Sequence, residues 1–381
     1  MSQALLPRAV YVPETSPPAG GALSRAKPKI LGASISVPAE SYSQSEILDR
    51  FRITDERVRS VFLSGSIERR HLVLPPDGPD GTPQIEAQGA LLAKHRAHGV
   101  RLAAEAVRTT LKEVGADVAD VGYLCCVTST GFLTPGFSAF LIRELGLRHH
   151  TGRLDVVGMG CNAGLNGLTA VTGWATAHPG QLSVMVCVEV CSAAYVFDGT
   201  MRSSVVNSLF GDGAAALAVA APAGAGTAGP AGSATGPEVL KFASCIIPDA
   251  IEAMRYDWDE QHGRFSFFLD RDIPYVVGAH AETVINRLLD GTGLRRSDIA
   301  HWVVHSGGKK VIDSVRVNLG LSRYDVRHTT GVLRDYGNVS SGSFIFSYQR
   351  LIEEGVVAPG EHAVLMTMGP GSTIETALVR F

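Results

Sequence analysis

Two long segments of this chain follow the same order of structural signals, and this internal repeat constrains the fold more than any other feature. Residues 100–131 and residues 280–308 each begin with an amphipathic, helix-like stretch that stops at a glycine. Each continues as an apolar stretch that ends in small polar residues. A constant offset aligns Leu111 with Leu289, Gly115 with Gly293 and Asp120 with Asp298. The repeat predicts two similarly folded halves.

The repeat continues downstream in three further pairs of segments. The first pair is a glycine turn that opens a helix of small residues, and the other two are apolar strands. The pairs are 158–171 and 336–348, 184–190 and 362–368, and 210–219 and 369–379. Alternation of helices with buried strands is typical of layered α/β folds. We therefore expect an α/β protein of two pseudo-symmetric halves with fused sheets, in which short side chains allow the helix after Cys161 to lie between layers.

Two segments of biased composition frame these halves. Residues 1–29 hold five prolines and little periodicity, and residues 222–237 consist almost entirely of Ala, Gly, Pro, Ser and Thr. Such segments bury too little side chain to offset their ordering entropy. We expect a flexible arm at 1–29, an N-terminal half at 30–221, a flexible loop at 222–237 and a C-terminal half at 238–381.

Composition and charge exclude several functional classes. The 381 residues include 34 Lys and Arg against 37 Asp and Glu, and they contain no basic run that would bind nucleic acid or an anionic membrane. No apolar run reaches the length of about 18 residues that a transmembrane helix requires. Six cysteines in a chain of this length do not indicate a disulfide framework. We expect a protein of the reducing cytoplasm with neither a nucleic-acid nor a membrane partner.

Cys161 is the first candidate for chemistry. The segment GMGCNAG (158–164) places it after a glycine turn, at the start of the predicted helix. A helix N-terminus favours a thiolate, and its free backbone N–H groups can bind an oxyanion. The pattern indicates a nucleophile, although an ordinary buried cysteine is an equally good interpretation of it. The ordinary interpretation is favoured for the cysteines in or beside apolar strands, which are Cys125, Cys126, Cys187 and Cys191.

His305 and Asn338 are the next candidates. His305 ends the apolar strand 302–304 and precedes two glycines, so its ring can face a site that the backbone approaches closely. Asn338 lies within one residue of the position that the repeat pairs with Cys161. In a pseudo-twofold fold the two helix starts face a common centre, which the strand before His305 also reaches. Considered alone, Asn338 could be the N-cap of the following helix, and His305 a structural residue.

Four ordered motifs resemble those of type III polyketide synthases, the chalcone-synthase-like branch of the thiolase superfamily. They are GCNAG (160–164), HSGG (305–308), YGNVSSG (336–342) and MGPGS (368–372). The resemblance extends from about residue 30 to residue 381 and includes FGDGAAA (210–216). It implies a thiolase-like fold with two pseudo-symmetric βαβαβαββ halves in a layered αβαβα arrangement. Three stretches are similar to the bacterial members that make 3,5-dihydroxyphenylacetyl-CoA for glycopeptide antibiotics, namely 128–136, 156–168 and 186–200.

The resemblance implies a role for each motif residue. Cys161 carries the acyl chain, and His305 stabilises its thiolate by an ion pair. His305 and Asn338 donate hydrogen bonds to a thioester carbonyl, which stabilises the enolate left when malonyl-CoA loses carbon dioxide. Asparagine suits this role because it donates without adding negative charge. The enolate then attacks the Cys161 thioester, and the chain grows by two carbons.

The resemblance also implies a substrate cavity. Phe210 and Phe267 align with the two phenylalanines that gate it, although ordinary core aromatics would also fit these positions. The aligned cavity-lining positions hold Ser129, Thr130, Cys191, Trp258 and Ser340. Because Trp258 stands where chalcone synthases have glycine, we expect its volume to restrict the cavity to a small product.

The candidates for binding CoA come from two segments. Arg57 and Arg59 lie in the stretch that matches the family's CoA-binding segment, and Lys310 follows HSGG, so all three could hold the CoA phosphates. The family's lysine pattern is not kept, and each charge could equally be a solvated surface residue. Gly307 and Gly308 would let the pantetheine arm pass close to the backbone.

These expectations converge on a type III polyketide synthase. We expect it to load malonyl-CoA, to extend it with further malonyl-CoA, and to cyclise the chain to a small aromatic acyl product such as 3,5-dihydroxyphenylacetyl-CoA. The sequence shows no ligand cluster and no dinucleotide motif, so we expect no metal and no redox cofactor. The resemblance implies a homodimer, with accessory dehydratase-type enzymes as pathway partners.

Three alternatives stay open. A 3-ketoacyl-carrier-protein synthase III shares the Cys-His-Asn set, but the HSGG and GPG motifs favour the polyketide synthase. A non-catalytic thiolase-fold subunit would not need all three residues. A cysteine hydrolase would not explain the paired glycine motifs and the two phenylalanines.

Overall fold

The computed structural model describes residues 27–196, 198–223 and 235–381. Most of the predicted arm at 1–29 and of the predicted loop at 222–237 lies outside the described residues. None of the helices in these ranges combines the length and the apolar run that crossing a bilayer requires.

One nine-stranded sheet runs through both halves of the described chain. In spatial order its strands are β11 (Ile299–Val304), β12 (His362–Gly369), β13 (Thr373–Arg380), β8 (Glu238–Ile246), β1 (Lys29–Ser36), β7 (Gly213–Ala220), β6 (Leu182–Glu189), β4 (Val121–Thr128) and β5 (Gly152–Val157). The halves meet where Lys29 of β1 pairs with Glu238 of β8. Each half therefore contributes one continuous part of the sheet, as the repeat predicts.

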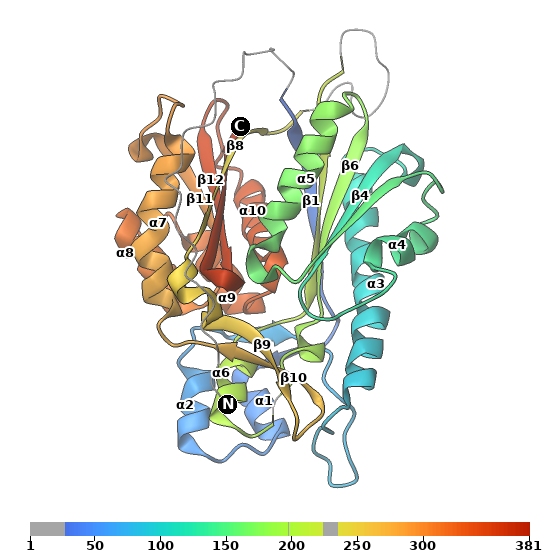
Figure 1. Cartoon of the computed structure of the whole chain (residues 1–381), viewed down its shortest axis with the longest axis vertical. Coiled ribbons are helices and arrows are strands. Elements are labelled where there is room, and N and C mark those ends of the chain that lie inside the picture. Colours follow the sequence, from blue (N-terminus) through green and yellow to red (C-terminus); the bar gives the residue numbers. More distant parts are fainter. Residues whose placement is uncertain (1–26, 197, 224–234) are drawn as a thin grey trace, which may run out of the picture.

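Helices cover the outer faces of the sheet and also separate its two parts (Figure 1). The central helices are α5 (Ala163–Ala177) and α10 (Ser343–Glu354), and the outer ones are α3 (Gln88–Glu113), α4 (Phe137–Leu145), α7 (Ile273–Leu289) and α8 (Lys309–Leu319). Short residues allow α5 to lie between layers. A Cβ on Gly164 would collide with the Ser341 carbonyl oxygen, and a Cβ on Gly167 would lie 2.7 Å from Sδ of Met185. The predicted αβαβα layering is confirmed.

The two halves differ by one strand. The N-terminal half has the predicted βαβαβαββ order, whereas the described C-terminal half contributes only four strands, β8, β11, β12 and β13, to the sheet. The segment that corresponds to β5 forms the helix α9 (Arg327–Tyr336) instead. This helix is amphipathic and buries Val332 and Leu333, so its pattern suits a helix better than a strand. The predicted second βαβαβαββ half is therefore wrong by one strand.

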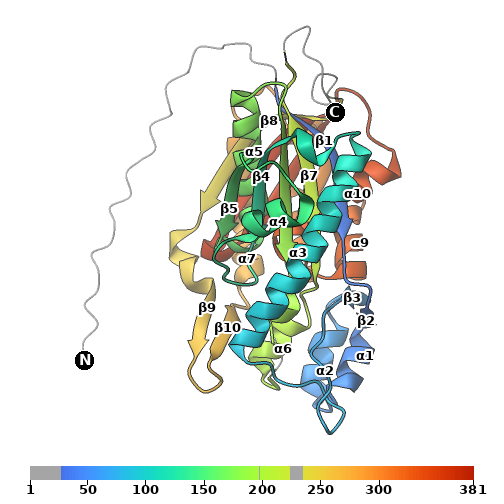
Figure 2. The same cartoon turned by 90° about the vertical axis from the view of Figure 1, so that its right-hand side faces the viewer.

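Smaller elements gather at one end of the molecule (Figures 1 and 2). They are α1 (Gln44–Arg50), α2 (Glu56–Leu63), α6 (Met201–Asn207), the hairpin of β9 (Met254–Asp259) and β10 (Arg264–Leu269), and the short pair of β2 (Ser41–Ser43) and β3 (Arg69–His71). Within the hairpin, Tyr256 pairs with Phe267 and Trp258 pairs with Phe265. This end of the molecule carries most of the aromatic residues that border the candidate site.

Candidate active site

Cys161 lies in a short 3-10 turn, Gly160–Asn162, that runs directly into α5. Gly160 has a φ of 75°, and a Cβ at this position would collide with the ring of Pro370. A Cβ on Gly369 would lie 3.0 Å from the backbone nitrogen of Cys161. The glycines of the GCNAG and MGPGS motifs therefore bring the start of α5 against the turn after β12.

Two side chains from the segment after α9 face the Cys161 sulfur. Sγ lies 3.5 Å from Oγ of Ser340, and the Asn338 side chain lies near enough to the sulfur to lower the pKa of the thiol. Oδ1 of Asn338 accepts hydrogen bonds from the Ser340 backbone nitrogen at 2.9 Å and from the Ser343 hydroxyl at 3.4 Å. Because the amide oxygen is already bound, the NH₂ group of Asn338 is the part offered to the sulfur.

His305 reaches the same place from the end of β11. Its side chain is buried, and its backbone nitrogen donates to the Met366 carbonyl at 2.8 Å. The Ser306 hydroxyl donates to the Gly337 carbonyl at 3.3 Å, which ties the His305 turn to the residue before Asn338. A Cβ on Gly307 would lie 3.0 Å from Cδ2 of His305, so the ring packs directly on this glycine. These contacts hold buried His305 next to the segment that carries Asn338, and Asn338 in turn lies near Cys161.

Phe210 and Phe267 border this site. Their ring centroids lie 6.4 Å apart with an interplanar angle of 83°, and both rings share one apolar cluster with Cys161. Phe210 is also joined to the site through the backbone, because Gly211 donates to the Asn338 carbonyl at 3.0 Å. The predicted aromatic pair therefore lies beside the Cys-His-Asn set.

Comparisons with known proteins match both halves of the chain. Residues 22–223 match the family model "Chalcone and stilbene synthases, N-terminal domain", and residues 239–381 match the corresponding C-terminal domain. The chain belongs to the chalcone and stilbene synthase family. The predicted resemblance to type III polyketide synthases is confirmed.

Individual relatives cover almost the whole synthase. It is 66% identical over 355 residues to a 3,5-dihydroxyphenylacetyl-CoA synthase of Streptomyces toyocaensis, a match that covers 93% of this chain and 90% of the relative. A 3,5-dihydroxyphenylacetyl-CoA synthase of Amycolatopsis balhimycina is 64% identical over 353 residues, with 93% of each chain covered. Among solved structures, the 1,3,6,8-tetrahydroxynaphthalene synthase of Streptomyces coelicolor superposes with a TM-score of 0.82 at 27% identity, covering 93% of this chain and 99% of that chain. The expected thiolase-like fold agrees with this superposition.

Burial determines the charge state of the synthase's Cys161 and His305. Desolvation raises the pKa of the Cys161 thiol to about 12, and the hydrogen bonds from Ser340 and Asn338 only partly oppose this shift. Desolvation also lowers the pKa of His305 to about 3. The ligand-free site at pH 7 therefore holds a thiol and a neutral imidazole, whereas the helix start led us to expect a thiolate. His305 can accept the thiol proton when a thioester arrives.

This charge state predicts how alkylation of Cys161 depends on pH. Because the thiol pKa is raised, the thiolate is a small fraction at pH 7. The rate constant for carboxamidomethylation by iodoacetamide should therefore rise about ten-fold per pH unit between pH 7 and 9. Peptide mass spectrometry follows Cys161, and Cys161→Ala identifies modification elsewhere. A rate that is constant above pH 6 would show a resting thiolate–imidazolium pair and contradict the prediction.

A buried carboxyl group that the sequence analysis did not single out lies beside the site. Glu189 ends β6, and its carboxylate accepts hydrogen bonds from the Ser129 nitrogen at 3.0 Å, the Ser341 nitrogen at 3.3 Å and the Ser341 hydroxyl. Burial outweighs these bonds and raises the pKa of Glu189 to about 7. The sequence does contain a signal for this residue, which is an acidic side chain inside the apolar strand VMVCVEV (184–190). A buried carboxylate is costly unless it is hydrogen-bonded, so such a residue indicates a polar site next to the strand.

Glu189→Gln should change the pH dependence of stability. Folding raises the pKa of Glu189 from 4.5 to about 7. Between these two pH values, the folded chain therefore binds more protons at Glu189 than the unfolded chain does. The wild-type free energy of unfolding should therefore fall by up to roughly 3 kcal/mol as the pH rises through this window, and the variant lacks this loss. Urea unfolding at pH 5 and pH 8 measures the difference between variant and wild type. An equal difference at both pH values would count against this account of Glu189.

The predicted cavity residues do not all lie at the site. Ser129 bonds to Glu189, Ser340 contacts the Cys161 sulfur, and the thiol of Cys191 is buried close enough to Cys161 that each charge would affect the other. Thr130 is buried, but its hydroxyl is engaged by His95 at 3.3 Å and by the Val190 nitrogen at 3.0 Å. Trp258 is 48% exposed and packs edge-on against Phe265 at 5.2 Å. The structure does not bring Trp258 to Cys161.

Two tyrosines pack against the predicted aromatic pair, namely Tyr195, which is buried, and Tyr256, which is 38% exposed. The ring of Tyr195 lies 4.1 Å from that of Phe210 and 5.3 Å from that of Phe267. Tyr256 lies 5.0 Å from Phe267, and its hydroxyl donates to the Ser129 carbonyl at 3.2 Å. The rings of the two tyrosines are nearly parallel, with centroids 6.3 Å apart. Tyr195 lies in the stretch 186–200 that the sequence analysis noted, but the sequence analysis singled out neither tyrosine.

The candidate CoA-binding residues lie around the start of α8 and on α2. Arg57 and Lys310 are exposed, and Arg59 donates from Nη1 to the Ile53 carbonyl at 3.0 Å. Gly308 has a φ of 128°, and a Cβ there would lie 3.4 Å from Cδ1 of Leu209. This contact sets the start of α8 next to the residue before Phe210. The part these charges play in CoA binding stays a prediction.

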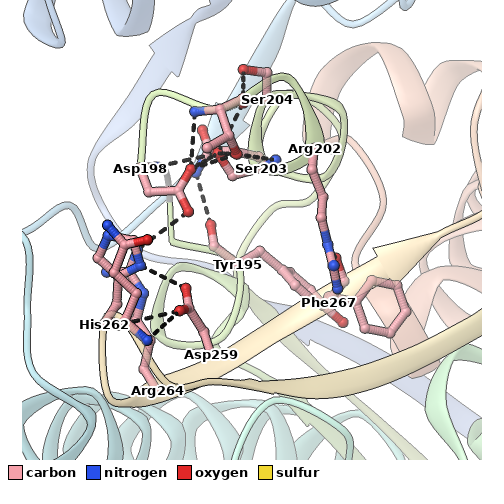
Figure 3. Close-up of polar contacts among 12 residues, drawn as sticks. Tyr195, Asp198, Arg202, Ser203, Ser204, Asp259, His262, Arg264 and Phe267 are labelled. Atoms are coloured by element: carbon pink, nitrogen blue, oxygen red, sulfur yellow. Dashed lines mark hydrogen bonds and ion pairs between the residues drawn. The ribbon is translucent and has the colours of Figure 1, made fainter.

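A polar cluster lies next to Tyr195 on the side away from Phe267 (Figure 3). Asp198 accepts hydrogen bonds from Thr200 and Ser203, and Nη2 of Arg264 lies 3.5 Å from Oδ2 of Asp198. Asp259 accepts from Nδ1 of His262 at 2.6 Å, and one ligand atom each of Asp198, Asp259 and His262 lie within 4.8 Å of one another. Because Arg264 and His262 already pair these carboxylates, we interpret the cluster as a structural tie between the loop before α6 and the β9–β10 hairpin.

Proposed function

We propose that this synthase condenses malonyl-CoA units into a small aromatic acyl thioester, 3,5-dihydroxyphenylacetyl-CoA. The observation that carries the proposal is the buried Cys161, His305 and Asn338 set. The names of the relatives that are 66% and 64% identical supply the product.

Each residue of the set has one task in the proposed reaction. As malonyl-CoA binds, His305 accepts the Cys161 proton, the sulfur attacks the thioester carbonyl, and CoA leaves as a thiol with that proton. For each extension, a second malonyl-CoA places its carbonyl against His305 and the NH₂ group of Asn338. Loss of carbon dioxide leaves an enolate, whose negative oxygen these donors stabilise. The enolate carbon then attacks the Cys161 thioester and displaces the sulfur.

The aromatic residues near Cys161 support a short product. Tyr195, Phe210 and Phe267 share one apolar cluster with Cys161, and the ring of Tyr256 lies 5.0 Å from that of Phe267. The malonyl group on Cys161 loses its carboxyl group as carbon dioxide, and three extensions of the two-carbon unit that remains give the eight carbon atoms of the 3,5-dihydroxyphenylacetyl group. Ring closure forms a carbon–carbon bond, and loss of water makes the ring aromatic. We propose that dehydratase-type enzymes of the same pathway assist this last step.

We also propose that the synthase works as a homodimer in the reducing cytoplasm. Within the described residues β5 is an edge strand that pairs with β4, and large apolar side chains near it are exposed, namely Phe132, Leu154, Val157 and Met159. An exposed edge with apolar neighbours favours coverage by a second copy. All six cysteines are free thiols, which supports a reducing compartment. Sedimentation should give about twice the chain mass of 40.3 kDa, and a monomeric mass would contradict the dimer.

Isotope labelling tests the proposed starter. The synthase receives unlabelled malonyl-CoA together with an equal amount of uniformly ¹³C-labelled acetyl-CoA. If malonyl-CoA supplies every unit, the aromatic product carries no label beyond natural abundance. Product molecules with one labelled two-carbon unit would show that acetyl-CoA is the starter and would reject this part of the proposal.

A further inference from the structure

The β9–β10 hairpin carries Phe267 to the Cys161 site without support from a larger sheet. Among the described residues, its two strands form a sheet of their own, apart from the nine-stranded sheet. A two-stranded hairpin alone is marginally stable in water, so its position depends on side chains that reach it from other elements. Phe267 is 8% exposed and shares an apolar cluster with Cys161. A loose hairpin would therefore open that cluster to water.

One side chain of α6 contacts both strands of this hairpin. Nη2 of Arg202 donates to Oδ2 of Asp257 on β9 at 2.7 Å, and its Nε donates to the Phe267 carbonyl on β10 at 3.5 Å. The guanidinium carbon also lies 5.4 Å from the centre of the Phe268 ring. Figure 3 shows the Arg202 side chain extending from its helix toward Phe267. The planar fork of N–H groups allows one arginine to make these contacts together.

A second arginine provides an internal comparison. Nε of Arg255 donates to Oδ1 of the same Asp257 at 2.9 Å, and its guanidinium carbon lies 4.4 Å from the centre of the same Phe268 ring. Its Nη1 donates to the carbonyl of Glu252, in the turn directly before β9. Arg255 itself belongs to β9, so these contacts stay within the hairpin and its adjoining turn. Of the two arginines, only Arg202 ties the hairpin to α6.

Three further contacts hold other parts of the hairpin. They are the hydrogen bonds from Tyr256 to Ser129 and from Phe265 to Gln88, and the ion pair of Arg264 with Asp198. None of these three contacts involves the backbone of Phe267, whereas Arg202 binds its carbonyl. Arg202 therefore anchors the hairpin at the residue that borders the site.

We propose that Arg202 is a positioning residue that acts through Phe267. By fastening the hairpin to α6, it holds the Phe267 ring in the apolar cluster beside Cys161 and keeps water and small reagents from the sulfur. The substrate part of this inference rests on the proposed function, because a fixed Phe267 should also help to position malonyl-CoA. Arg202 and Asp257 are both partly exposed, and such ion pairs add little to stability. The effect should therefore appear at the site rather than in Tm.

Arg202→Met keeps most of the length of the side chain and removes its charge and its donors. Iodoacetamide should alkylate Cys161 at pH 8 about five- to ten-fold faster in this variant than in wild type, because an ion pair and a cation–π contact no longer oppose opening of the hairpin. KM for malonyl-CoA should rise, while Tm changes little. Arg202→Lys should recover part of both effects, since lysine keeps the charge but not the fork. Peptide mass spectrometry measures the alkylation of Cys161.

Arg255→Met is the matched control, because it removes contacts to the same Asp257 and Phe268 without breaking the tie to α6. Its alkylation rate and KM should stay close to those of wild type. If a melting curve shows that Arg202→Met does not fold, Arg202→Lys carries the comparison.

The outcomes separate this inference from the proposed function. An unchanged alkylation rate in Arg202→Met would overturn the inference, and so would an equal rise in both methionine variants. Faster alkylation of Arg202→Met with an unchanged KM would reject the substrate part alone. Faster alkylation of Arg202→Met, together with no use of malonyl-CoA by the wild-type synthase, would overturn the proposed function and support the assigned position of Phe267.

Discussion

Cys161→Ala should leave no acyl group on the synthase and should lower kcat for the aromatic product on the order of a thousand-fold or more. The sulfur holds the growing chain next to the enolate donors, and without it each condensation loses the advantage of a tethered partner. Intact-protein mass spectrometry after incubation with malonyl-CoA measures the acyl group, and liquid chromatography measures the product.

Cys125→Ala is a matched control for this loss. Cys125 is also buried, and burial raises its pKa to about 12, as it does for Cys161. It lies in β4, outside the Cys-His-Asn set, so Cys125→Ala should still form the acyl-enzyme. An acyl group that persists on the Cys161→Ala protein would show that another residue carries the chain.

Asn338→Asp should slow the decarboxylation of malonyl-CoA by about 100- to 1,000-fold. One oxygen of the new carboxylate can keep the hydrogen bonds from Ser340 and Ser343, so the side chain should keep its orientation. The other oxygen replaces the NH₂ group that faces Cys161. A donor is thereby lost, and a negative charge is placed where the enolate forms. The rate of release of carbon dioxide from malonyl-CoA measures the effect.

Two comparisons distinguish this effect from a loss of structure. Transfer of the malonyl group from malonyl-CoA to Cys161 forms no enolate, so Asn338→Asp should impair it less than decarboxylation. Asn318→Asp makes the same isosteric change on the exposed face of α8 and should leave both rates unchanged. Equal impairment of transfer and decarboxylation by Asn338→Asp would contradict the assigned role.

The sequence patterns predicted those parts of the fold that depend on residues close together in the chain. Helix and strand patterns in each half are short-range features, and they gave the layers and most elements in the correct order. The missing strand of the C-terminal half depends on tertiary contacts. Arg327 and His328 of α9 both pair with Glu354 at the end of α10, and the repeat contains no information about these pairings. A pseudo-symmetric sequence therefore predicts the common elements better than the differences between the halves.

The candidate site shows the same limit. Glycine motifs mark positions where two backbone segments approach each other closely, so the sequence alone was enough to single out Cys161, His305 and Asn338. Trp258 and Tyr256 are two residues apart on one strand and share a face, so alignment could not decide which one reaches the site. The helix start at Cys161 predicted a thiolate, but the burial that opposes it comes from residues distant in the chain. The space beside Cys161 and the desolvation of its thiol depend on many residues that are distant in the sequence, so short motifs do not predict them.

The most direct test of the account is mass spectrometry of the purified synthase incubated with malonyl-CoA as its only substrate. The account predicts an eight-carbon aromatic acyl product, together with an acyl mass on the peptide that contains Cys161. The account is contradicted if neither forms, and product appears only after another acyl-CoA or a malonyl carrier protein is added.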